Sequence, residues 1–341
     1  MPPAASPPGS RPTTAATPSR GLHALSWIAS LAVFGGALWL LHRYLHHIAW
    51  GDVAAAWSRM PAWRIAYSAA AAAVSIAMLA LFDVLAARVV ARGRVSAGLA
   101  AFAGAVTQGI SNTLGFHAIT GSALRYRIYA SAGLGAGDIA RIVGLAGLGV
   151  GMGFAVVITG ALCREPAIAY GWGRWAGVAL ALLLIALVGW LARPRTLALG
   201  RLRLPLPGAG VVSAQMLIGG IEMLAAISAL YVLLPTASAP PFVDFLPIYV
   251  GAVLAGIVSH SPGGLGVFET IMLASFPPEA RADLLAAMLC YRVTYNLLPF
   301  VLGSTALAMF ELRLRQRGRP PDAGDAAPTP ASRPEGARAH D

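Results

Sequence analysis

The feature that most constrains this chain is a series of apolar stretches, each long enough to cross a lipid bilayer as a helix. A helix needs about 20 apolar residues to span roughly 30 Å of hydrocarbon. Six unbroken stretches are about this long or longer: Leu25 to Leu45, Trp63 to Ala87, Ile139 to Leu162, Trp175 to Leu191, Val211 to Leu234 and Leu284 to Phe310. The sequence therefore predicts an all-α, polytopic helical membrane protein with about six full spans.

The charge content excludes the main soluble classes. Of the 341 residues, 57% are hydrophobic and only 11% are charged, against about 25% charged residues in soluble domains. The net charge of +11 would suit a nucleic-acid binder, but the arginines stand in short clusters between apolar stretches, as in membrane-protein loops. We therefore expect membrane lipids as partners and no nucleic acid.

Two further apolar segments are broken by polar residues and glycines. The first runs from Ala97 to Tyr129 and the second from Phe242 to Phe276. The breaks contain Gln108, Ser111, Asn112, Gly115, His117 and Gly121 in the first segment, and Ser259, His260, Ser261, Pro262, Gly263 and Gly264 in the second. We interpret each segment as a re-entrant helical pair that enters the bilayer and returns to the same face.

Arginine clusters support this interpretation. Lys and Arg are enriched in cytoplasmic loops, so clusters at residues 88–94, 193–203 and 313–319 should all lie inside. A single crossing at 97–129 would place the first two clusters on opposite faces, whereas a re-entrant pair places both inside. Both termini are then cytoplasmic. Eight ordinary spans, with some loops breaking the charge rule, remain the alternative.

This topology divides the chain into two similar parts. Residues 25–162 and 175–310 each contain three spans and one re-entrant pair, and this odd number of crossings makes them an inverted repeat, an arrangement typical of transporters. The whole membrane domain is expected over residues 25–312. Residues 1–24 and the basic stretch 313–341 are rich in Pro, Ala, Ser, Thr or Arg and predict disordered tails.

Charged residues inside apolar stretches mark the candidate site, because each is costly to place in hydrocarbon. Glu222 lies near the middle of one span, Arg292 lies within the last span, and Glu269 follows the second break. A buried charge is far costlier unpaired than paired, so we expect Arg292 to pair with Glu222 or Glu269. The alternative is a cluster that only fixes helix packing.

The residues around Arg292 form a polar face on the last span. Tyr291 and Tyr295 lie one turn apart, as do Arg292 and Asn296. Pro299 cannot donate to the carbonyl of Tyr295 and leaves that acceptor free. We include all four polar residues in the candidate substrate-binding site.

Both breaks offer groups suited to a phosphate. A helix that begins near Gly263 and Gly264 would present free N–H groups at its positive end, where Glu269 is the competing anion. In the first pair, Arg125 and Tyr129 share one face while Arg127 points elsewhere, and Asn112 lies in the break. These arginines would bind a lipid phosphate or, alternatively, anchor to headgroups at the interface. Asp83, near a span end, is expected to be an interfacial or capping group.

No pattern for catalysis or cofactors is present in the sequence. Cys163 and Cys290 have no neighbouring ligand pattern, and His42 and His46 have no convincing third ligand. Serine-hydrolase, Walker and dinucleotide motifs are absent. We expect no catalytic residue, no metal and no cofactor.

Three stretches together resemble a known family. They run over residues 115–129, residues 261–269 (Ser-Pro-Gly-Gly-Leu-Gly-Val-Phe-Glu) and residues 291–299. They resemble the flippase-like transmembrane region of lysylphosphatidylglycerol synthases and the stand-alone bacterial membrane proteins that share it. The resemblance implies an inner-membrane protein that handles lipids. Because no soluble synthase domain follows residue 310, we expect a stand-alone form that does not itself make lysylphosphatidylglycerol.

The sequence thus favours translocation of a phospholipid or related amphiphile, with an anionic headgroup, between leaflets. Two alternatives remain open. One is secondary transport of a small organic anion through the same site, and the other is a non-transporting partner subunit of a lipid-modifying enzyme.

Overall fold

The computed structural model describes residues 50–114, 117–164, 172–193, 196–199, 202–205, 207–259, 264 and 266–317. The expected span at 25–45 and most of both expected tails lie outside these residues. The elements in chain order are α2 (Trp50–Ser58), α3 (Ala62–Val90), α4 (Ala97–Leu114), α5 (His117–Ala130), α6 (Ala136–Arg164), α7 (Trp172–Trp190), β1 (Thr196–Leu199), β2 (Leu202–Pro205), α8 (Ala209–Tyr231), α9 (Phe242–Val258), α10 (Val267–Ser275), η2 (Pro278–Ala280), α11 (Arg281–Tyr291), η3 (Arg292–Leu297) and α12 (Leu298–Arg317).

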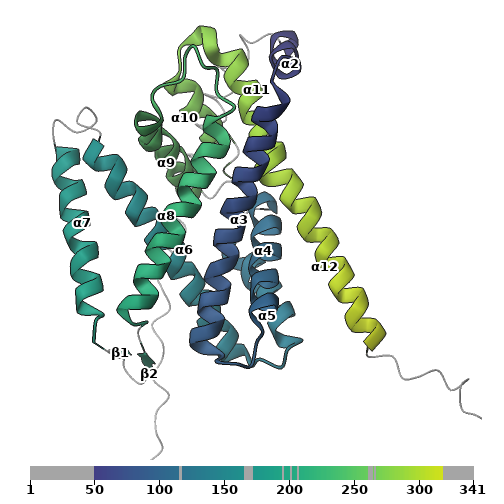
Figure 1. Ribbon diagram of the computed structural model, residues 1–341, viewed down its shortest axis with the longest axis vertical. Helices are drawn as coiled ribbons and strands as arrows, with labels where there is room; N and C mark the ends of the chain where they lie inside the picture. The colour runs from purple at the N-terminus through teal and green to yellow at the C-terminus, as the bar shows by residue number, and fades with distance from the viewer. Residues whose placement is uncertain are drawn as a thin grey trace, which may run out of the picture.

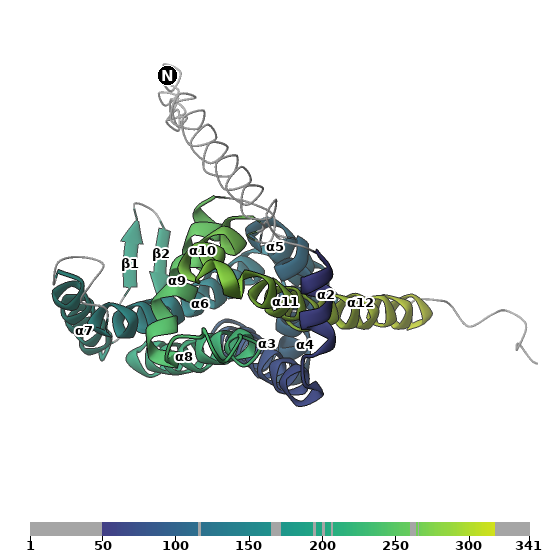
Figure 2. The ribbon, with the colours of Figure 1, turned by 90° about the horizontal axis from the view of Figure 1, so that it is seen from above.

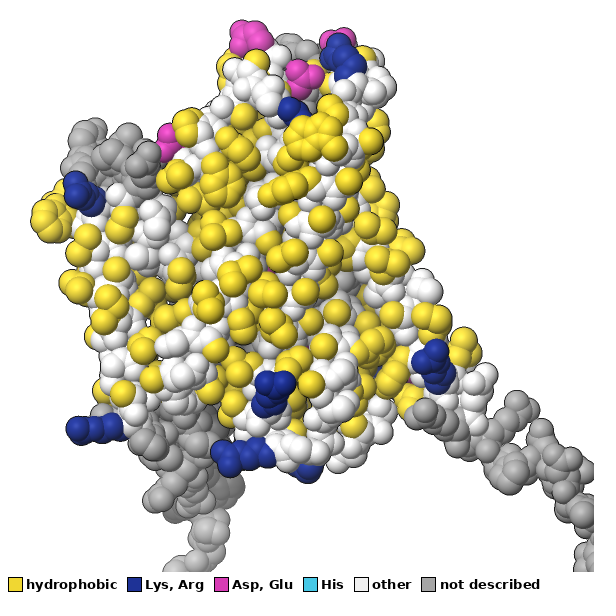
Figure 3. All heavy atoms as spheres, in the orientation of Figure 1, with side chains coloured by type: hydrophobic (Ala, Val, Ile, Leu, Met, Phe, Trp, Pro, Cys, Tyr) yellow, Lys and Arg dark blue, Asp and Glu magenta, His cyan; other side chains and the backbone are white. Residues whose placement is uncertain are grey.

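Long helices stand side by side and form a polytopic membrane protein, as predicted (Figure 1). Within the described residues, five helical stretches are long and apolar enough to cross a membrane: Ala62–Val90, Ala136–Cys163, Trp172–Trp190, Ala209–Tyr231 and Pro278–Leu314. They correspond to the five predicted spans that fall in this part of the chain. Hydrophobic side chains cover most of the face in Figure 3, and charged side chains gather at its two ends.

The all-α fold class is confirmed, with one short hairpin in addition to the helices. Strands β1 and β2 pair antiparallel, with Thr196 opposite Pro205 and Leu199 opposite Leu202. Leucines alternate with other residues along both strands, and this period of two favours a strand over a helix. The hairpin lies between α7 and α8, whose ends are joined by a hydrogen bond of 2.9 Å from the amide of Ala209 to the carbonyl of Leu191.

Helix α3 packs against three other long helices, α4, α6 and α8, while α12 packs against α4. Figure 2 shows α7 at one side of the assembly and α12 leaving at the other. The buried residues form two hydrophobic clusters, one built mainly from α8, α9, α10 and α11, and the other from α3, α4 and α6. Helix α12 continues to Arg317, beyond the predicted end of the membrane domain at residue 312.

The first broken segment is a hairpin of two helices that returns to the end where it starts. Arg94, before α4, forms an ion pair with Asp138, which follows α5. A second ion pair joins Arg127 of α5 to Glu311 near the end of α12. We call this end, with Arg94, Arg127 and Asp138, the basic end; it is the lower end in Figure 1. Helix α5 has 14 residues and a length of about 21 Å, too short to cross the hydrocarbon.

The second broken segment is a hairpin that opens to the opposite end. The turn before α9 is held by Tyr231, whose hydroxyl donates to the carbonyl of Pro240 at 2.9 Å. Arg64 donates to the carbonyl of Leu234, and Arg59 lies 3.7 Å from Asp283 of α11. We call this end, with Arg59, Leu234 and Asp283, the far end. Two hairpins that open to opposite ends are what an inverted repeat predicts.

Two glycines bring α6 and α8 into direct contact. A Cβ atom at Gly219 would lie 2.3 Å from the Cα of Gly153, and one at Gly153 would lie 2.6 Å from the Cα of Gly219. Helices in a bilayer gain stability from such close packing of small residues, because lipid offers no hydrophobic force to drive them together.

Substitution of Gly219 by alanine should force α6 and α8 apart and lower the free energy of unfolding by about 1–3 kcal/mol. Gly220→Ala is the matched control, because its Cβ would meet only Val156 at an ordinary 3.7 Å. Both substitutions raise helix propensity equally, so the difference in thermal unfolding midpoint in detergent isolates the clash. Equal midpoints would contradict the close α6–α8 contact.

Single cysteines should establish the orientation of the first hairpin. In a variant without Cys163 and Cys290, we expect Ala97→Cys and Ala136→Cys to react with an impermeant maleimide from one face of the membrane. Ala237→Cys, in the turn before α9, should react from the other face. All three positions are solvent-exposed, so access does not require unfolding. Reaction of Ala97→Cys and Ala136→Cys from opposite faces would show that residues 97–136 cross the membrane once.

Candidate functional site

The candidate site is built around η3, where the last long helix changes from α to π geometry. Leu298 donates its amide to the carbonyl of Val293, five residues earlier, as a π-helix requires. Pro299, the next residue, has no amide to donate to Tyr295, so regular α-helical bonding cannot continue through this point. The interruption turns several polar side chains of η3 toward neighbouring helices at mid-height of the bundle.

One side of η3 is held by a buried carboxylate. The hydroxyl of Ser75 on α3 donates to Oε1 of Glu222 on α8 at 2.8 Å. The hydroxyl of Tyr295 lies 2.8 Å from the Ser75 hydroxyl and 3.4 Å from the same carboxylate oxygen. Glu222 is only 7% exposed and, among the described residues, takes part in no ion pair. Sequence reasoning missed Ser75, because a serine among alanines carries no distinctive signal.

The other side of η3 is held by an ion pair. Arg292 donates to Oε1 of Glu269 through Nε at 3.0 Å and through Nη2 at 2.6 Å. The side chains of Arg292 and Glu269 are 22% and 15% exposed. Of the two partners predicted for Arg292, the structure therefore selects Glu269. The guanidinium also lies over the ring of Phe268, 5.7 Å from its centroid.

Glu269 also binds the start of its own helix. Its Oε2 accepts the amide of Gly266 at 2.8 Å, and α10 begins one residue later. The helix thus starts after the predicted position near Gly263 and Gly264, and its positive end already faces a carboxylate. Gly263 lies outside the described residues. Gly264 has a positive φ of 67°, which favours glycine, and a Cβ atom at Gly256 of α9 would lie only 3.3 Å from its Cα.

Stacked aromatic rings connect the two sides of η3. The rings of Tyr291 and Tyr295 are nearly parallel with centroids 4.9 Å apart, as their spacing predicts. The hydroxyl of Tyr291 lies 2.7 Å from that of Tyr249 on α9. The ring of Phe268 is also nearly parallel to that of Tyr291, with centroids 6.5 Å apart. The ion pair and the Glu222 network therefore share one continuous aromatic wall.

The tip of the first hairpin also contacts η3. Asn296 donates through Nδ2 to the carbonyl of Asn112 at 3.2 Å, and Thr113 donates to the carbonyl of Asn296 at 3.0 Å. The Oδ1 atom of Asn296 is buried without a hydrogen-bond partner among the described residues. A Cβ atom at Gly109 would lie 2.6 Å from the carbonyl oxygen of Pro299, so α4 and α12 are in backbone contact. Both hairpin tips thus meet on η3.

A second buried ion pair lies nearer the basic end. Arg125 makes a bidentate contact with Asp83, with Nε–Oδ1 at 2.8 Å and Nη2–Oδ2 at 2.7 Å, and Tyr129 donates to Oδ1 at 3.1 Å. Arg125 and Tyr129 share a face, as predicted. Asp83 is wholly buried, which corrects its expected role as an interfacial or capping group. Its position near the end of α3 suggested an interfacial role and did not predict that Arg125 of α5 would bind it.

Arg127 is separate from this network. It makes a bidentate contact with Glu311 at the basic end, and its side chain is 64% exposed. The structure therefore places the predicted site residues in two groups. One surrounds η3 and contains Asn112, Glu222, Glu269, Tyr291, Arg292, Tyr295 and Asn296, while Arg125, Arg127 and Tyr129 lie toward the basic end, each arginine paired with a carboxylate.

Removing the negative charge of Glu269 should destabilise the fold more than removing a surface charge. Glu269→Gln removes the carboxylate that pairs with the partly buried Arg292, which should lower the free energy of unfolding by about 2–4 kcal/mol. Glu311→Gln breaks the contact with the exposed Arg127 and should cost much less, because water solvates that arginine after the change. Denaturant titrations in mixed micelles measure both values. Equal losses would mean that the Arg292–Glu269 pair is solvated like the surface pair.

Comparison with known proteins places this chain among bacterial membrane proteins. It is 31% identical to the uncharacterized protein slr0712 of Synechocystis over 304 residues, covering 84% of this chain and 94% of that protein. It is 27% identical to the inner membrane protein YbhN of Escherichia coli over 210 residues, covering 58% of this chain and 65% of YbhN. No protein-family profile matches the chain.

A shorter similarity links the chain to a lipid-modifying enzyme. Over 100 residues it is 34% identical to the phosphatidylglycerol lysyltransferase of Staphylococcus aureus. The match covers 28% of this chain and 12% of that enzyme.

Proposed function

We propose that this chain, which belongs to the same family as the Synechocystis protein slr0712, moves a phospholipid or related amphiphile between the leaflets of a bacterial inner membrane. The observation that carries the proposal is the meeting of two oppositely oriented hairpin tips on η3. Glu269 of the second hairpin and Asn112 of the first both bind this segment. Many transporters place their substrate site at interrupted helices between inverted halves, and this arrangement supports alternating access.

The groups around η3 suit a zwitterionic or anionic headgroup. A phosphate has the charge and the oxygen geometry to replace the carboxylate of Glu269 on the guanidinium of Arg292. Such an exchange keeps the arginine paired throughout, which avoids the cost of an isolated buried charge. Asn296, with its unsatisfied Oδ1 atom, and Tyr295 offer further polar contacts.

Two more arginine–carboxylate pairs, nearer the basic end, could exchange a carboxylate for a phosphate in the same way. Arg125, now paired with Asp83, and Arg127, now paired with Glu311, would receive the phosphate in turn as their carboxylates release it. The Arg292–Glu269 pair is the proposed gate between the two faces. Glu222 supplies a second carboxylate on the other side of η3. The predicted phosphate contacts of Arg125 and Arg127 thus become exchange steps between anions.

The relatives guide the choice of lipid and membrane. Phosphatidylglycerol lysyltransferase acts, by its name, on phosphatidylglycerol, which makes this anionic lipid the first candidate substrate. YbhN is named as an inner membrane protein. With the basic end on the cytoplasmic side, the arginines around Arg94 and Arg127 satisfy the positive-inside rule, and both termini lie in the cytoplasm.

Reconstituted protein should make headgroup-labelled phosphatidylglycerol in the inner leaflet accessible to an external quencher. Glu269→Gln and Arg292→Ala should each slow this rate by about tenfold or more, a change of about 1.4 kcal/mol in the barrier. Asp138→Asn, which alters a charge at the basic end outside the site, should keep the rate of the wild type. Folding of each variant is checked by gel filtration and thermal unfolding.

A rate equal to that of protein-free liposomes would overturn the proposal. The same vesicles loaded with small organic anions would then test the solute-transporter alternative. If Asp138→Asn loses lipid movement as Glu269→Gln and Arg292→Ala do, the loss is not specific to η3, and the site can no longer be assigned to that segment.

A further inference from the structure

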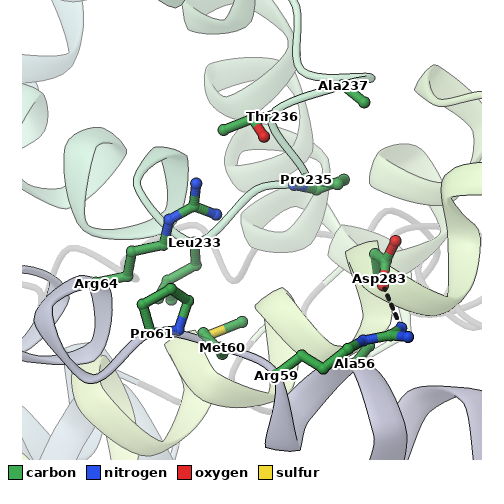
Figure 4. A pocket seen from close by; sticks show the side chains of 10 residues that line it. All are labelled: Ala56, Arg59, Met60, Pro61, Arg64, Leu233, Pro235, Thr236, Ala237 and Asp283. Carbon is green, nitrogen blue, oxygen red and sulfur yellow. Dashed lines mark ion pairs between the residues drawn. The ribbon is translucent and has the colours of Figure 1, made fainter.

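Two adjoining cavities lie at the far end, between the start of α3 and the end of α8. Their volumes are about 250 Å³ and about 430 Å³, and both are lined by Arg64 and Thr236. Figure 4 shows the smaller cavity, which Arg64 and Arg59 border from opposite sides of Pro61. The larger cavity is within the size range of small-molecule binding sites. Neither cavity contains a residue of the η3 site.

Arg64 is incompletely satisfied at this position. Its Nη1 donates to the carbonyl of Leu234 at 3.3 Å, while its Nε is buried and lacks a hydrogen-bond partner among the described residues. No ion pair of Arg64 occurs in the part of the chain that the structure describes, whereas Arg59 has Asp283 at 3.7 Å. The guanidinium also lies over the ring of Trp63, 5.5 Å from its centroid. Because Arg64 lines both cavities without a carboxylate partner among the described residues, its charge favours an anion that enters from the cavity.

Most residues that line the larger cavity are apolar or aromatic. Trp63 and Tyr67 are 61% and 51% exposed on the first turns of α3, and Phe242 lies opposite at the start of α9. Exposed Trp and Tyr at the end of a span mark the level where headgroups meet hydrocarbon. An occupant therefore meets a cation and an aromatic, lipid-facing wall at the same depth.

We propose that the two adjoining cavities form one groove, and that this groove binds a phospholipid of the leaflet at the far end. Its phosphate lies against Arg64 and its first acyl carbons lie along Trp63 and Tyr67. A free phosphate would leave the aromatic wall without a partner, and a cation would meet Arg64 and Arg59. The inference rests on the proposed function, for which the groove is the docking position of the substrate at one face.

A photoreactive lipid tests this position directly. Full-length protein in liposomes is irradiated with phosphatidylglycerol that carries a diazirine near the start of one acyl chain, and the adducts are located by peptide mass spectrometry. We expect adducts on residues 63–67 and 228–242. Arg64→Ala should reduce them at least fivefold, as the loss of a charge-assisted phosphate contact predicts. Arg174→Ala is the matched control, because this arginine lies between the exposed Trp172 and Trp175 of α7, away from both cavities.

A diacylglycerol with the same diazirine separates the headgroup from the acyl chain. It should label residues 63–67 and 228–242 several-fold less than the phospholipid, and equal labelling would overturn the role of Arg64. If residues 63–67 and 228–242 carry no adducts while lipid still moves between leaflets, lipid binding in the groove is overturned and the proposed function stands. Arg64-dependent adducts in a protein that moves no lipid would support the groove and overturn translocation.

Discussion

Every polar side chain at the level of η3 has to find a partner within the protein, because hydrocarbon provides none. This requirement explains why elements far apart in the sequence converge on six residues of one helix. Ser75 and Glu222 come from α3 and α8, Glu269 from α10, and Asn112 from α4. The bundle is organised so that each of these helices reaches η3 with its polar group.

Pro299 gives the convergence point its local geometry. Without an amide at this position, the helix relaxes into π geometry over residues 292–297, and successive side chains point in directions that a regular helix would not give them. Arg292 is directed to the second hairpin, while Asn296 is directed to the first. A single interruption thus links two hairpins that enter from opposite ends.

The pairing of charges was only partly predictable. The sequence identified Arg292 as a buried charge and reduced its partners to Glu222 and Glu269, since both lie in apolar surroundings. The choice between them depends on where α10 begins, and the amide of Gly266 fixes that point by binding Glu269. Asp83 shows the same limit, because its position near a helix end gave no indication that Arg125, 42 residues later, would bind it.

The sequence by itself determined the fold class and the position of nearly every helix. Length and hydropathy are local properties, and in a bilayer they suffice to specify a span. It also located both helix breaks, because glycine and polar residues interrupt apolar runs visibly. Only the tertiary structure decided that the first hairpin returns to the basic end and that the second opens to the far end. It also decided that carboxylates form ion pairs with the arginines that were expected to bind phosphate. Those outcomes depend on long-range packing, such as the Gly153–Gly219 contact, in which neither residue carries a signal of its partner.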